Sequence, residues 1–311
     1  MDLRDAFFNS LYDLVKDDDN FYFLMADMWA FSLQKFKDRL GDRFINVGIS
    51  EQNMISVAAG LAKEGKKVCV YTITPFVTER CFEQIKVDLC CMNLPVMIVG
   101  IGAGLTYSHD GPTHQTTYDI SIMRSLPNMS VYSPSTPLVN KRVAELAYRS
   151  ECPSYIRLDK GNFEDIYNNI SSQQTGGILG PLEPDADLAI ITTGSIVYEV
   201  AKAIPILYRD EGINVTMTDV YMIKPIDEKR LVKIISGHER VAVIEEHSSI
   251  GGLGSIVSEI MIDNKLYKPL QKISLPDEFC KNYGDRDWIR KQYGLDKDCI
   301  LKSILDWNEE Q

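Results

Sequence analysis

Short apolar runs rich in β-branched and aromatic residues alternate along this chain with longer stretches of helical periodicity. Residues 51–63 and 82–92 each gather their apolar side chains on one helical face. Helices of this length, placed between short strands, serve as crossovers that pair the strands in parallel. The sequence therefore predicts an α/β fold of mostly parallel sheets flanked by helices. The short runs of the first half are Phe21–Met25, Lys67–Thr72, Val96–Val99, Ser130–Tyr132 and Ser154–Leu158.

The alternation lapses once, near the middle of the chain. The stretch from Asn162 to Pro184 is rich in Asn, Ser, Gln, Gly and Pro, a composition typical of a connector. Strand and helix patterns resume at Leu188–Thr192 and continue in a second, smaller α/β unit. A length of 311 residues also favours two domains. We expect domains at 1–165 and 185–311, joined by a linker at 166–184.

The charge balance excludes several classes of partner. Lys and Arg number 33 against 44 Asp and Glu, so the net charge is −11 and polyanions such as nucleic acids or anionic membranes are repelled. The apolar runs are far shorter than the roughly 20 residues of a membrane span. The start lacks a secretory pattern, which favours a mature chain that begins near Met1 and stays in the cytoplasm.

The cysteines give no sign of a disulfide framework or a metal site. Seven cysteines occur, without a C-x-x-C pair or a histidine at zinc-finger spacing. We interpret them as small buried side chains in a reducing compartment, and we expect no metal ligands on this chain.

A lone carboxylate, Glu51, stands where the run Asn46–Met54 turns from a strand into an apolar helix. One explanation is structural, because an acidic residue in the first helical turn complements the helix dipole by about 0.3–1 kcal/mol. The other is functional, because open α/β sheets bind ligands at the carboxyl ends of their strands. The residues alone leave both explanations open.

Two of the four histidines cluster just beyond the predicted strand Val96–Val99. The run Tyr107–Gln115 contains His109, Asp110 and His114 around a Gly-Pro turn. Titratable groups on a loop after a parallel strand are typical of a binding site. A functional loop is favoured, although Asp110 also suits a structural Asx-turn.

A glycine-rich turn at Gly251–Ser255 opens a helix in the second half. Its spacing differs from that of dinucleotide-binding loops, and two acidic residues, Glu245 and Glu246, precede it and would oppose a bound phosphate. We interpret it as a tight turn with close helix packing. His238 is expected in a surface loop.

Taken together and in order, six segments resemble the C-terminal half of transketolase, that is, its pyrimidine-binding domain followed by its C-terminal domain. The similarity extends over essentially the whole chain. The segments are Gly48–Met54, Tyr71–Phe76, Phe82–Gln84, Asp110–Gln115, Arg124–Met129 and Glu245–Gly254.

The resemblance also shows what this sequence lacks. Transketolases carry an N-terminal domain with a Gly-Asp-Gly motif for Mg and the cofactor diphosphate, and no Gly-Asp-Gly occurs here. The resemblance therefore implies one subunit of a split transketolase that uses thiamine diphosphate. A partner chain with that motif would complete an α2β2 assembly, and this chain would also self-associate.

The resemblance assigns residues to the cofactor. It places Glu51 beside the pyrimidine N1′, where a charge-assisted hydrogen bond favours the imino tautomer that activates the thiazolium. Phe76 and Phe82 resemble the aromatic residues that stack on the pyrimidine, and Asp27 matches an Ala-Asp pair near the thiazolium. For Phe82, a plain core position is an equally open alternative.

It also assigns residues to a sugar or sugar-phosphate substrate. Asp110 resembles a residue that accepts a hydrogen bond from the acceptor's C2 hydroxyl, and His114 resembles one that contacts the ketol oxygens and shuttles protons. His109 belongs to the same candidate substrate site. Lys160, with Arg157 nearby, falls where the family has a phosphate-binding Arg, and Lys lacks the bidentate fork of Arg.

The function that follows is transfer of a two-carbon ketol unit between sugars. Alternatives within thiamine chemistry are a 2-oxo acid dehydrogenase β subunit and a 1-deoxyxylulose-5-phosphate synthase-like enzyme. The Asp110–His114 run disfavours the first, because sugar-reading residues are not needed there. An alternative of another class is a non-catalytic regulatory half. The presence of Glu51 weighs against it, since burying a carboxylate costs several kcal/mol.

Overall fold

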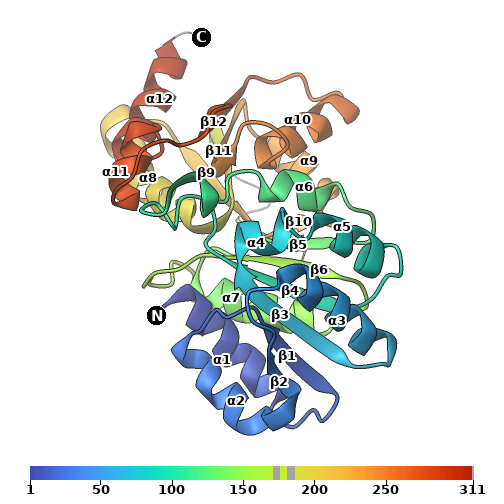
Figure 1. Ribbon diagram of the computed structural model, residues 1–311. Helices are drawn as coiled ribbons and strands as arrows, with labels where there is room; N and C mark the ends of the chain where they lie inside the picture. Colours follow the sequence, from blue (N-terminus) through green and yellow to red (C-terminus); the bar gives the residue numbers. More distant parts are fainter. Residues whose placement is uncertain (171–175, 181–185, 310–311) are drawn as a thin grey trace. The chain divides into compact units, whose positions relative to one another are not determined.

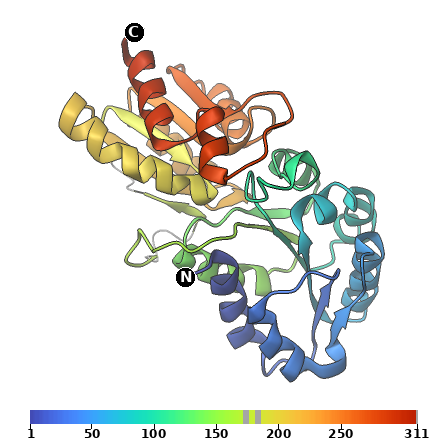
Figure 2. The ribbon, with the colours of Figure 1, turned by 60° about the vertical axis from the view of Figure 1, so that its left-hand side comes forward.

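The computed structural model of the chain describes residues 1–170, 176–180 and 186–309. Contacts between residues divide it into two units, which Figures 1 and 2 show from two sides. The first unit comprises Met1–Ala103 and Ile122–Asn169, and the second comprises Gly104–Ser121 and the chain from Ile170 onward. The predicted boundaries stay predictions. Parts of the predicted linker (171–175 and 181–184) and of the predicted second domain (185 and 310–311) lie outside the described residues.

The first unit is built on a parallel sheet. Within this unit its strands lie in the order β5-β6-β4-β3-β1-β2, and every neighbouring pair among them is parallel. All residues of β4 are buried, as expected for a parallel strand covered on both faces. The strands are β1 (Phe21–Met25), β2 (Phe44–Asn46), β3 (Lys67–Ile73), β4 (Val96–Ile101), β5 (Ser130–Tyr132) and β6 (Ser154–Leu158).

Helices cover both faces of this sheet (Figure 1). Because βαβ crossovers are right-handed, a change in the direction of strand order moves the connecting helix to the other face. Accordingly α1 packs against α7, while α3 packs against β3 and the segment after α5. The helices are α1 (Leu3–Val15), α2 (Gln34–Leu40), α3 (Glu51–Lys63), α4 (Thr74–Thr78), α5 (Phe82–Gln84) and α7 (Pro137–Tyr148), with α6 (Asp119–Arg124) running from the second unit into the first.

The helix expected over residues 82–92 is not a regular α-helix. After α5 the chain continues as a π-helical segment, η3 (Ile85–Cys90). The amide of Cys91 donates to the carbonyl of Lys86, and the amide of Leu94 to the carbonyl of Leu89, which are the i to i+5 bonds of a π-turn. The widened turn shifts the side-chain register, which the apolar spacing alone does not reveal.

The second unit has its own sheet, in the order β12-β11-β8-β9-β7. Its strands are parallel except β7, which runs antiparallel to β9. Helix α8 packs with α12, and α10 packs with α9. The elements are β7 (Ile178–Leu179), β8 (Leu188–Thr192), α8 (Val197–Glu211), β9 (Val215–Val220), β10 (Met222–Lys224), α9 (Glu228–Ser236), β11 (Arg240–Ser248), α10 (Leu253–Asp263), β12 (Leu270–Leu275), α11 (Arg286–Gln292) and α12 (Lys297–Glu309).

These two sheets confirm the predicted α/β class, and the strands predicted at Phe21–Met25, Ser130–Tyr132 and Ser154–Leu158 have the expected bounds. Among the described residues, no helix combines the length and apolarity that a membrane crossing requires.

The expected surface position of His238 is wrong. The side chain is 2% exposed, and its Nδ1 lies 2.7 Å from the carbonyl oxygen of Ile234 at the end of α9. The histidine folds back over the last turn of the helix, so it is buried although it follows a helix end.

Candidate active site

Three neighbouring parallel strands, β1, β2 and β3, end together at one edge of the first sheet. Met25, at the end of β1, is in register with Asn46 at the end of β2 and with Tyr71 near the end of β3. Segments that follow these ends therefore meet at the same edge, the place where open α/β sheets bind ligands. Among the predicted cofactor residues, Asp27 follows β1, Glu51 follows β2, and Phe76 follows β3.

Asp27 adopts a backbone conformation that is rare for a residue with a side chain. Its φ is +48°, and such geometry persists where neighbouring contacts enforce it. Asn46 provides these contacts: its Oδ1 accepts from the amides of Asp27 (3.1 Å) and Gly48 (3.0 Å), and its Nδ2 donates to Asp27 Oδ1 at 3.2 Å. The exposed Asp27 carboxylate is thus held in place at the carboxyl end of the sheet.

Glu51 is the first residue of α3, and its side chain is 3% exposed. Its carboxylate Oε2 accepts a hydrogen bond from Arg80 Nη1 at 2.8 Å. The arginine side chain is 45% exposed, so it lies between the buried carboxylate and solvent. A dipole-complementing helix residue needs no burial, and the buried position therefore favours the functional explanation of Glu51.

Arg80 also contacts the aromatic ring of Phe76. The guanidinium carbon lies 4.4 Å from the ring centroid, and the backbone carbonyl of Arg80 accepts from Gln52 Nε2 at 3.1 Å. A planar group with N–H donors is thus stacked on Phe76 and hydrogen-bonded to Glu51. Sequence reasoning missed Arg80. Its spacing of four residues after Phe76, which places two side chains on one face of a helical turn, is the signal that points to it.

Cys81, next to Arg80, is fully buried. Burial, and to a smaller degree the Glu51 carboxylate, raise the pKa of its thiol to about 12. The thiol therefore stays protonated at neutral pH.

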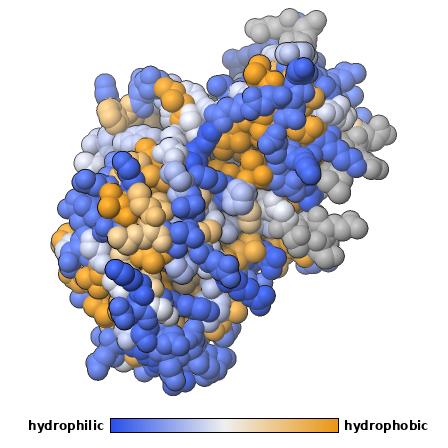
Figure 3. Space-filling model, turned by 90° about the vertical axis from the view of Figure 1, so that its right-hand side faces the viewer, coloured by the Kyte–Doolittle hydropathy of each residue, from blue (hydrophilic) through white to orange (hydrophobic). Residues whose placement is uncertain are grey.

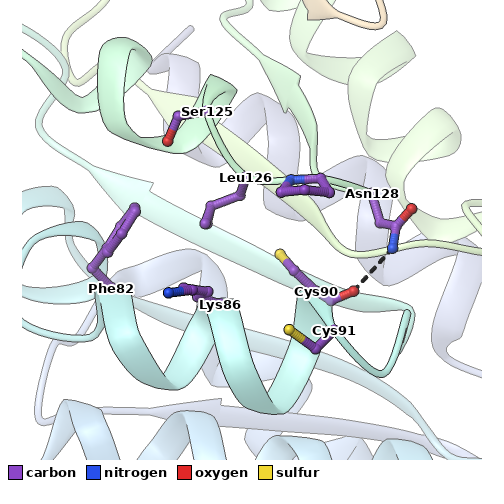
Figure 4. A pocket seen from close by; sticks show the side chains of 8 residues that line it. Phe82, Lys86, Cys90, Cys91, Ser125, Leu126 and Asn128 are labelled. Carbon is purple, nitrogen blue, oxygen red and sulfur yellow. Dashed lines mark hydrogen bonds between the residues drawn. The ribbon is translucent and has the colours of Figure 1, made fainter.

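Phe82 lines a pocket and is not part of the Glu51–Arg80–Phe76 contacts. A pocket of about 370 Å³ is formed between the segment after α5 and the run Ser125–Asn128 (Figure 4). In this view Phe82 and Lys86 lie across from Ser125 and Leu126, while Asn128 Nδ2 donates to the carbonyl of Cys90 at 3.0 Å. The structure thus links Phe76 to Glu51 through Arg80, but it shows no such link for Phe82.

Arg157 and Lys160 differ in their accessibility. Arg157 lies in β6 and is 3% exposed, whereas Lys160 is exposed beyond the end of that strand. Between them, the buried Asp159 accepts the Lys160 amide on its Oδ1 at 2.7 Å. Of the two cations, Lys160 is the one open to a ligand from solvent.

The predicted substrate residues of the second unit share one tight turn. A short 3₁₀ segment over Gly111–Thr113 separates Asp110 from His114, and the amide of His114 donates to the carbonyl of Gly111. His109 and Asp110 are exposed and His114 is half-buried. The imidazole Nδ1 of His114 is 2.9 Å from Thr113 Oγ1. The turn therefore presents a carboxylate and an imidazole a few residues apart.

The tight-turn interpretation of Gly251–Ser255 is confirmed. Glu245 Oε2 and Oε1 accept from the amides of Leu253 (2.7 Å) and Gly254 (2.8 Å) at the start of α10. A Cβ atom at Gly252 would lie 2.3 Å from Glu245 Oε2. The protein's own carboxylate thus occupies the position at which a helix N-terminus would bind a phosphate.

Potential metal ligands are not clustered in the part of the chain that the structure describes, since no three His, Cys, Asp or Glu side chains are placed to hold an ion together.

Comparisons with known proteins identify two family domains along the chain. Residues 1–165 match "Transketolase, pyrimidine binding domain" and residues 181–300 match "Transketolase, C-terminal domain". An apulose-4-phosphate transketolase subunit of Phocaeicola vulgatus is 32% identical over 98% of this chain and 96% of its own. A protein of Methanocaldococcus jannaschii named "Putative transketolase C-terminal section" is 36% identical over 98% and 95%, respectively.

A solved structure has the same fold along its whole length. "Split gene transketolase, inactive beta4 tetramer" superposes with a TM-score of 0.86 and 29% identity, covering 98% of both chains. Longer relatives include 1-deoxy-D-xylulose-5-phosphate synthases, of which the chain spans about half (49%) in one example from Caldanaerobacter subterraneus.

Proposed function

This chain belongs to the transketolase family, and we propose that it is the second subunit of a split transketolase, which transfers a two-carbon ketol unit between sugars or sugar phosphates. Relatives of matching length carry the names of such subunits. The observation that carries the proposal is the buried Glu51 carboxylate, whose arginine partner is stacked on Phe76.

The residues at this edge of the sheet fit the aminopyrimidine of thiamine diphosphate. That ring is planar and apolar on its faces, and in the imino tautomer its N1′ carries an N–H donor. The Arg80 guanidinium has these same properties, and it makes the two contacts that the pyrimidine would make, with the Phe76 ring and the Glu51 carboxylate. Because Arg80 is 45% exposed, it is free to move into solvent when the cofactor takes its place.

When bound, thiamine diphosphate supplies the nucleophilic carbon that cleaves the donor ketose. Glu51 holds a hydrogen bond at the pyrimidine nitrogen, and its burial strengthens that bond because the surroundings are less polar than water. Phe76 packs on the ring and keeps water from it, and Phe82 remains a second candidate for stacking. Asp27, fixed by Asn46, is a candidate for contact near the thiazolium.

Substrate recognition is assigned to the turn in the second unit. Asp110 accepts a hydrogen bond from a sugar hydroxyl, and His114 contacts the ketol oxygens and moves protons. His109 is exposed beside them. Lys160 is assigned to a phosphate group, and Arg157, buried in β6, stays a candidate for the same substrate site.

A partner chain would complete the site. Close in sequence to Asp27 and Glu51 stand apolar side chains that are exposed: Ile49 at 79%, Phe31 at 91% and Trp29 at 41%. Exposed apolar side chains that gather beside a polar site favour a protein interface. Figure 3, which faces the side of α3 and α5, shows further apolar surface among hydrophilic residues. Val57 on α3, Val87 in η3 and Met92 just after η3 are exposed.

We assign to the partner the Gly-Asp-Gly motif, the Mg ligands and the diphosphate contacts, within an α2β2 assembly in which this chain also contacts its own copy. We further propose a cytoplasmic location, which free cysteines throughout the described chain support. A 1-deoxyxylulose-5-phosphate synthase-like reaction is the second candidate, because such synthases are also relatives.

Calorimetry with thiamine diphosphate and Mg²⁺ tests the assembly. We expect no binding by this chain alone and tight binding by the chain co-purified with a partner that carries Gly-Asp-Gly. A panel of ketose donors and aldose acceptors then tests the reaction, with pyruvate as a donor to detect the synthase alternative. Micromolar cofactor binding by the isolated chain would contradict the split site, and a pair that binds cofactor but transfers no ketol would contradict the reaction.

A further inference from the structure

The loop that bears Asp110 and His114 belongs to the second unit, although the chain reaches it directly from β4 of the first. Residues 104–121 have their contacts with the second unit. Leu105 is fully buried in that unit's core. The carbonyl of Thr117 accepts the Ser248 amide at 2.7 Å, and Ser121 Oγ donates to the carbonyl of Ile250 at 2.6 Å. The second unit therefore fixes both the beginning and the end of the loop.

Glu246 ties the beginning of the loop to α11. Its Oε1 accepts from the Leu105 amide at 2.6 Å and from Arg286 Nη2 at 2.7 Å, and its Oε2 accepts from Arg290 Nε. There is no space between the loop and this carboxylate, because a Cβ at Gly104 would lie 2.4 Å from Glu246 Oε1. One buried carboxylate thus sets the position of the loop relative to α11.

Tyr283 stands three residues before Arg286 and contacts the middle of the same loop. Its ring lies directly on Gly111, since a Cβ there would be 2.4 Å from Tyr283 Cε1 and 2.7 Å from its hydroxyl oxygen. Gly111 is buried and has a φ of +70°, while Tyr283 remains 62% exposed. The short segment that carries Tyr283 is anchored by Cys280, which is 3% exposed in the core, and by Asp285, which caps α11.

We infer that Tyr283 is a positioning residue for substrate recognition: its ring holds the Gly111 turn and thereby fixes Asp110 and His114. The inference rests on the proposed function, in which those two residues contact the sugar. Leu105 and Ser121 fix the ends of the loop, and the Tyr283 ring adds a contact to its middle part, directly on Gly111. Tyr283 would then contribute to specificity without contacting the substrate itself.

The test compares Tyr283→Ala with Tyr283→Phe, and uses Tyr208→Ala on α8 as the control because Tyr208 is equally exposed, at 62%. In the isolated chain, amide hydrogen exchange is measured over residues 104–116. We expect Tyr283→Ala to speed exchange there about tenfold, and Tyr283→Phe and Tyr208→Ala to leave it at the wild-type rate.

In the co-purified pair, the same variants are assayed for ketol transfer. Tyr283→Ala should raise the acceptor KM about tenfold, because misplacement of Asp110 weakens acceptor binding, and should lower kcat by a smaller factor, because His114 in the same turn moves protons. Tyr283→Phe should restore the wild-type KM, since the ring is retained.

Gly111→Ala, introduced into the wild-type chain and into Tyr283→Ala, tests whether positions 111 and 283 are coupled. In the wild-type chain the new methyl group clashes with the Tyr283 ring, and the alanine backbone is strained by its positive φ. In Tyr283→Ala only the backbone strain remains. We expect a smaller additional rise in KM in the second background.

Exchange over residues 104–116 that is unchanged in Tyr283→Ala overturns the inference, and so does an unchanged acceptor KM. A wild-type pair without ketol transfer overturns the proposed function instead, and the exchange data of the isolated chain still decide whether Tyr283 holds the loop.

Discussion

Two buried glutamates, one in each unit, resemble each other in burial and differ in bonding. Glu51 in the first unit is 3% exposed and Glu246 in the second is 4% exposed. Among the described residues, Glu51 has one hydrogen-bonding side-chain partner, the half-exposed Arg80. Glu246 bonds the Leu105 amide together with Arg286 and Arg290, whose side chains are only 15% and 4% exposed.

The difference teaches which buried charge is available for chemistry. A carboxylate whose oxygens are all bonded to fixed donors within the fold has no capacity left for a ligand, and removing it takes a charged partner from two arginines. A carboxylate whose one partner reaches in from solvent can exchange that partner for a ligand at little cost. Glu246 is of the first kind and Glu51 of the second.

The largest expected effect is that of Glu51→Gln on turnover. In the co-purified pair we expect ketol transfer to fall about 10²–10⁴-fold, because the neutral amide no longer supports proton movement in the cofactor. The midpoint of urea unfolding should stay near that of wild type. Glu83→Gln, at an exposed position in the same unit, serves as the control and should match wild type in both measurements. Near-normal turnover would mean that Glu51 acts only as a charge that complements the helix dipole.

The same substitution at Glu246 should lower stability and leave cofactor binding intact. Glu246→Gln removes the carboxylate that binds both Arg286 and Arg290, and the free energy of unfolding should drop by about 3–5 kcal/mol. Urea unfolding of the isolated chain measures this loss, and the variant pair, where folded, should retain cofactor binding. A stability equal to that of wild type would show that the arginines find other partners and that the two glutamates are alike.

The buried imidazole in the second unit extends the comparison to pH. His238 Nδ1 is bonded to the Ile234 carbonyl, and its Nε2 has no hydrogen-bond partner in the described part of the chain. Burial, aided by the Lys268 cation, lowers the pKa of His238. The ordinary pKa of histidine is about 6.5. Below this pH the unfolded chain binds a proton at His238 that the folded chain does not bind. The free energy of unfolding therefore falls as pH falls through that value, by at most about 1.4 kcal/mol per pH unit.

His238→Asn tests this pH effect, because the Asn amide can still donate to Ile234 but does not titrate. Unfolding free energies measured from pH 7 to pH 5 should decline more steeply for wild type than for the variant. Parallel curves would mean that the imidazole becomes protonated within the fold.

The fold was largely predictable because it depends on local patterns. Alternating apolar runs define the strands. The glycine turn was also readable, since Glu245 and Glu246 precede it in sequence and one of them fills the site. The resemblance, not the spacing, supplied the roles of Glu51 and His114.

What the sequence did not reveal depends on contacts across long distances or on small irregularities. Tyr283 lies on Gly111 from 172 residues away, and no local pattern predicts such a contact. The π-turn over Ile85–Cys90 adds one residue to a helix without altering its apolar character. His238 is buried because its ring folds back on α9, and its position after a helix end suggested exposure instead.

The smallest expected effect, and the sharpest test of the comparison, is that of Arg80→Leu on stability. Removing a partner from a buried carboxylate normally costs several kcal/mol, as expected at Glu246. Here the departing side chain is the group that separates Glu51 from solvent, since it is 45% exposed, so water can hydrate the carboxylate in its place. Leucine also retains apolar contact with Phe76. We therefore expect a loss below about 1 kcal/mol, the range of exposed ion pairs, in urea unfolding of the isolated chain. A loss of about 3 kcal/mol or more would show that Arg80 is as integral to the fold as Arg290. In that case a ligand could not displace Arg80 from Glu51 at little cost, and the distinction between the two glutamates would fail.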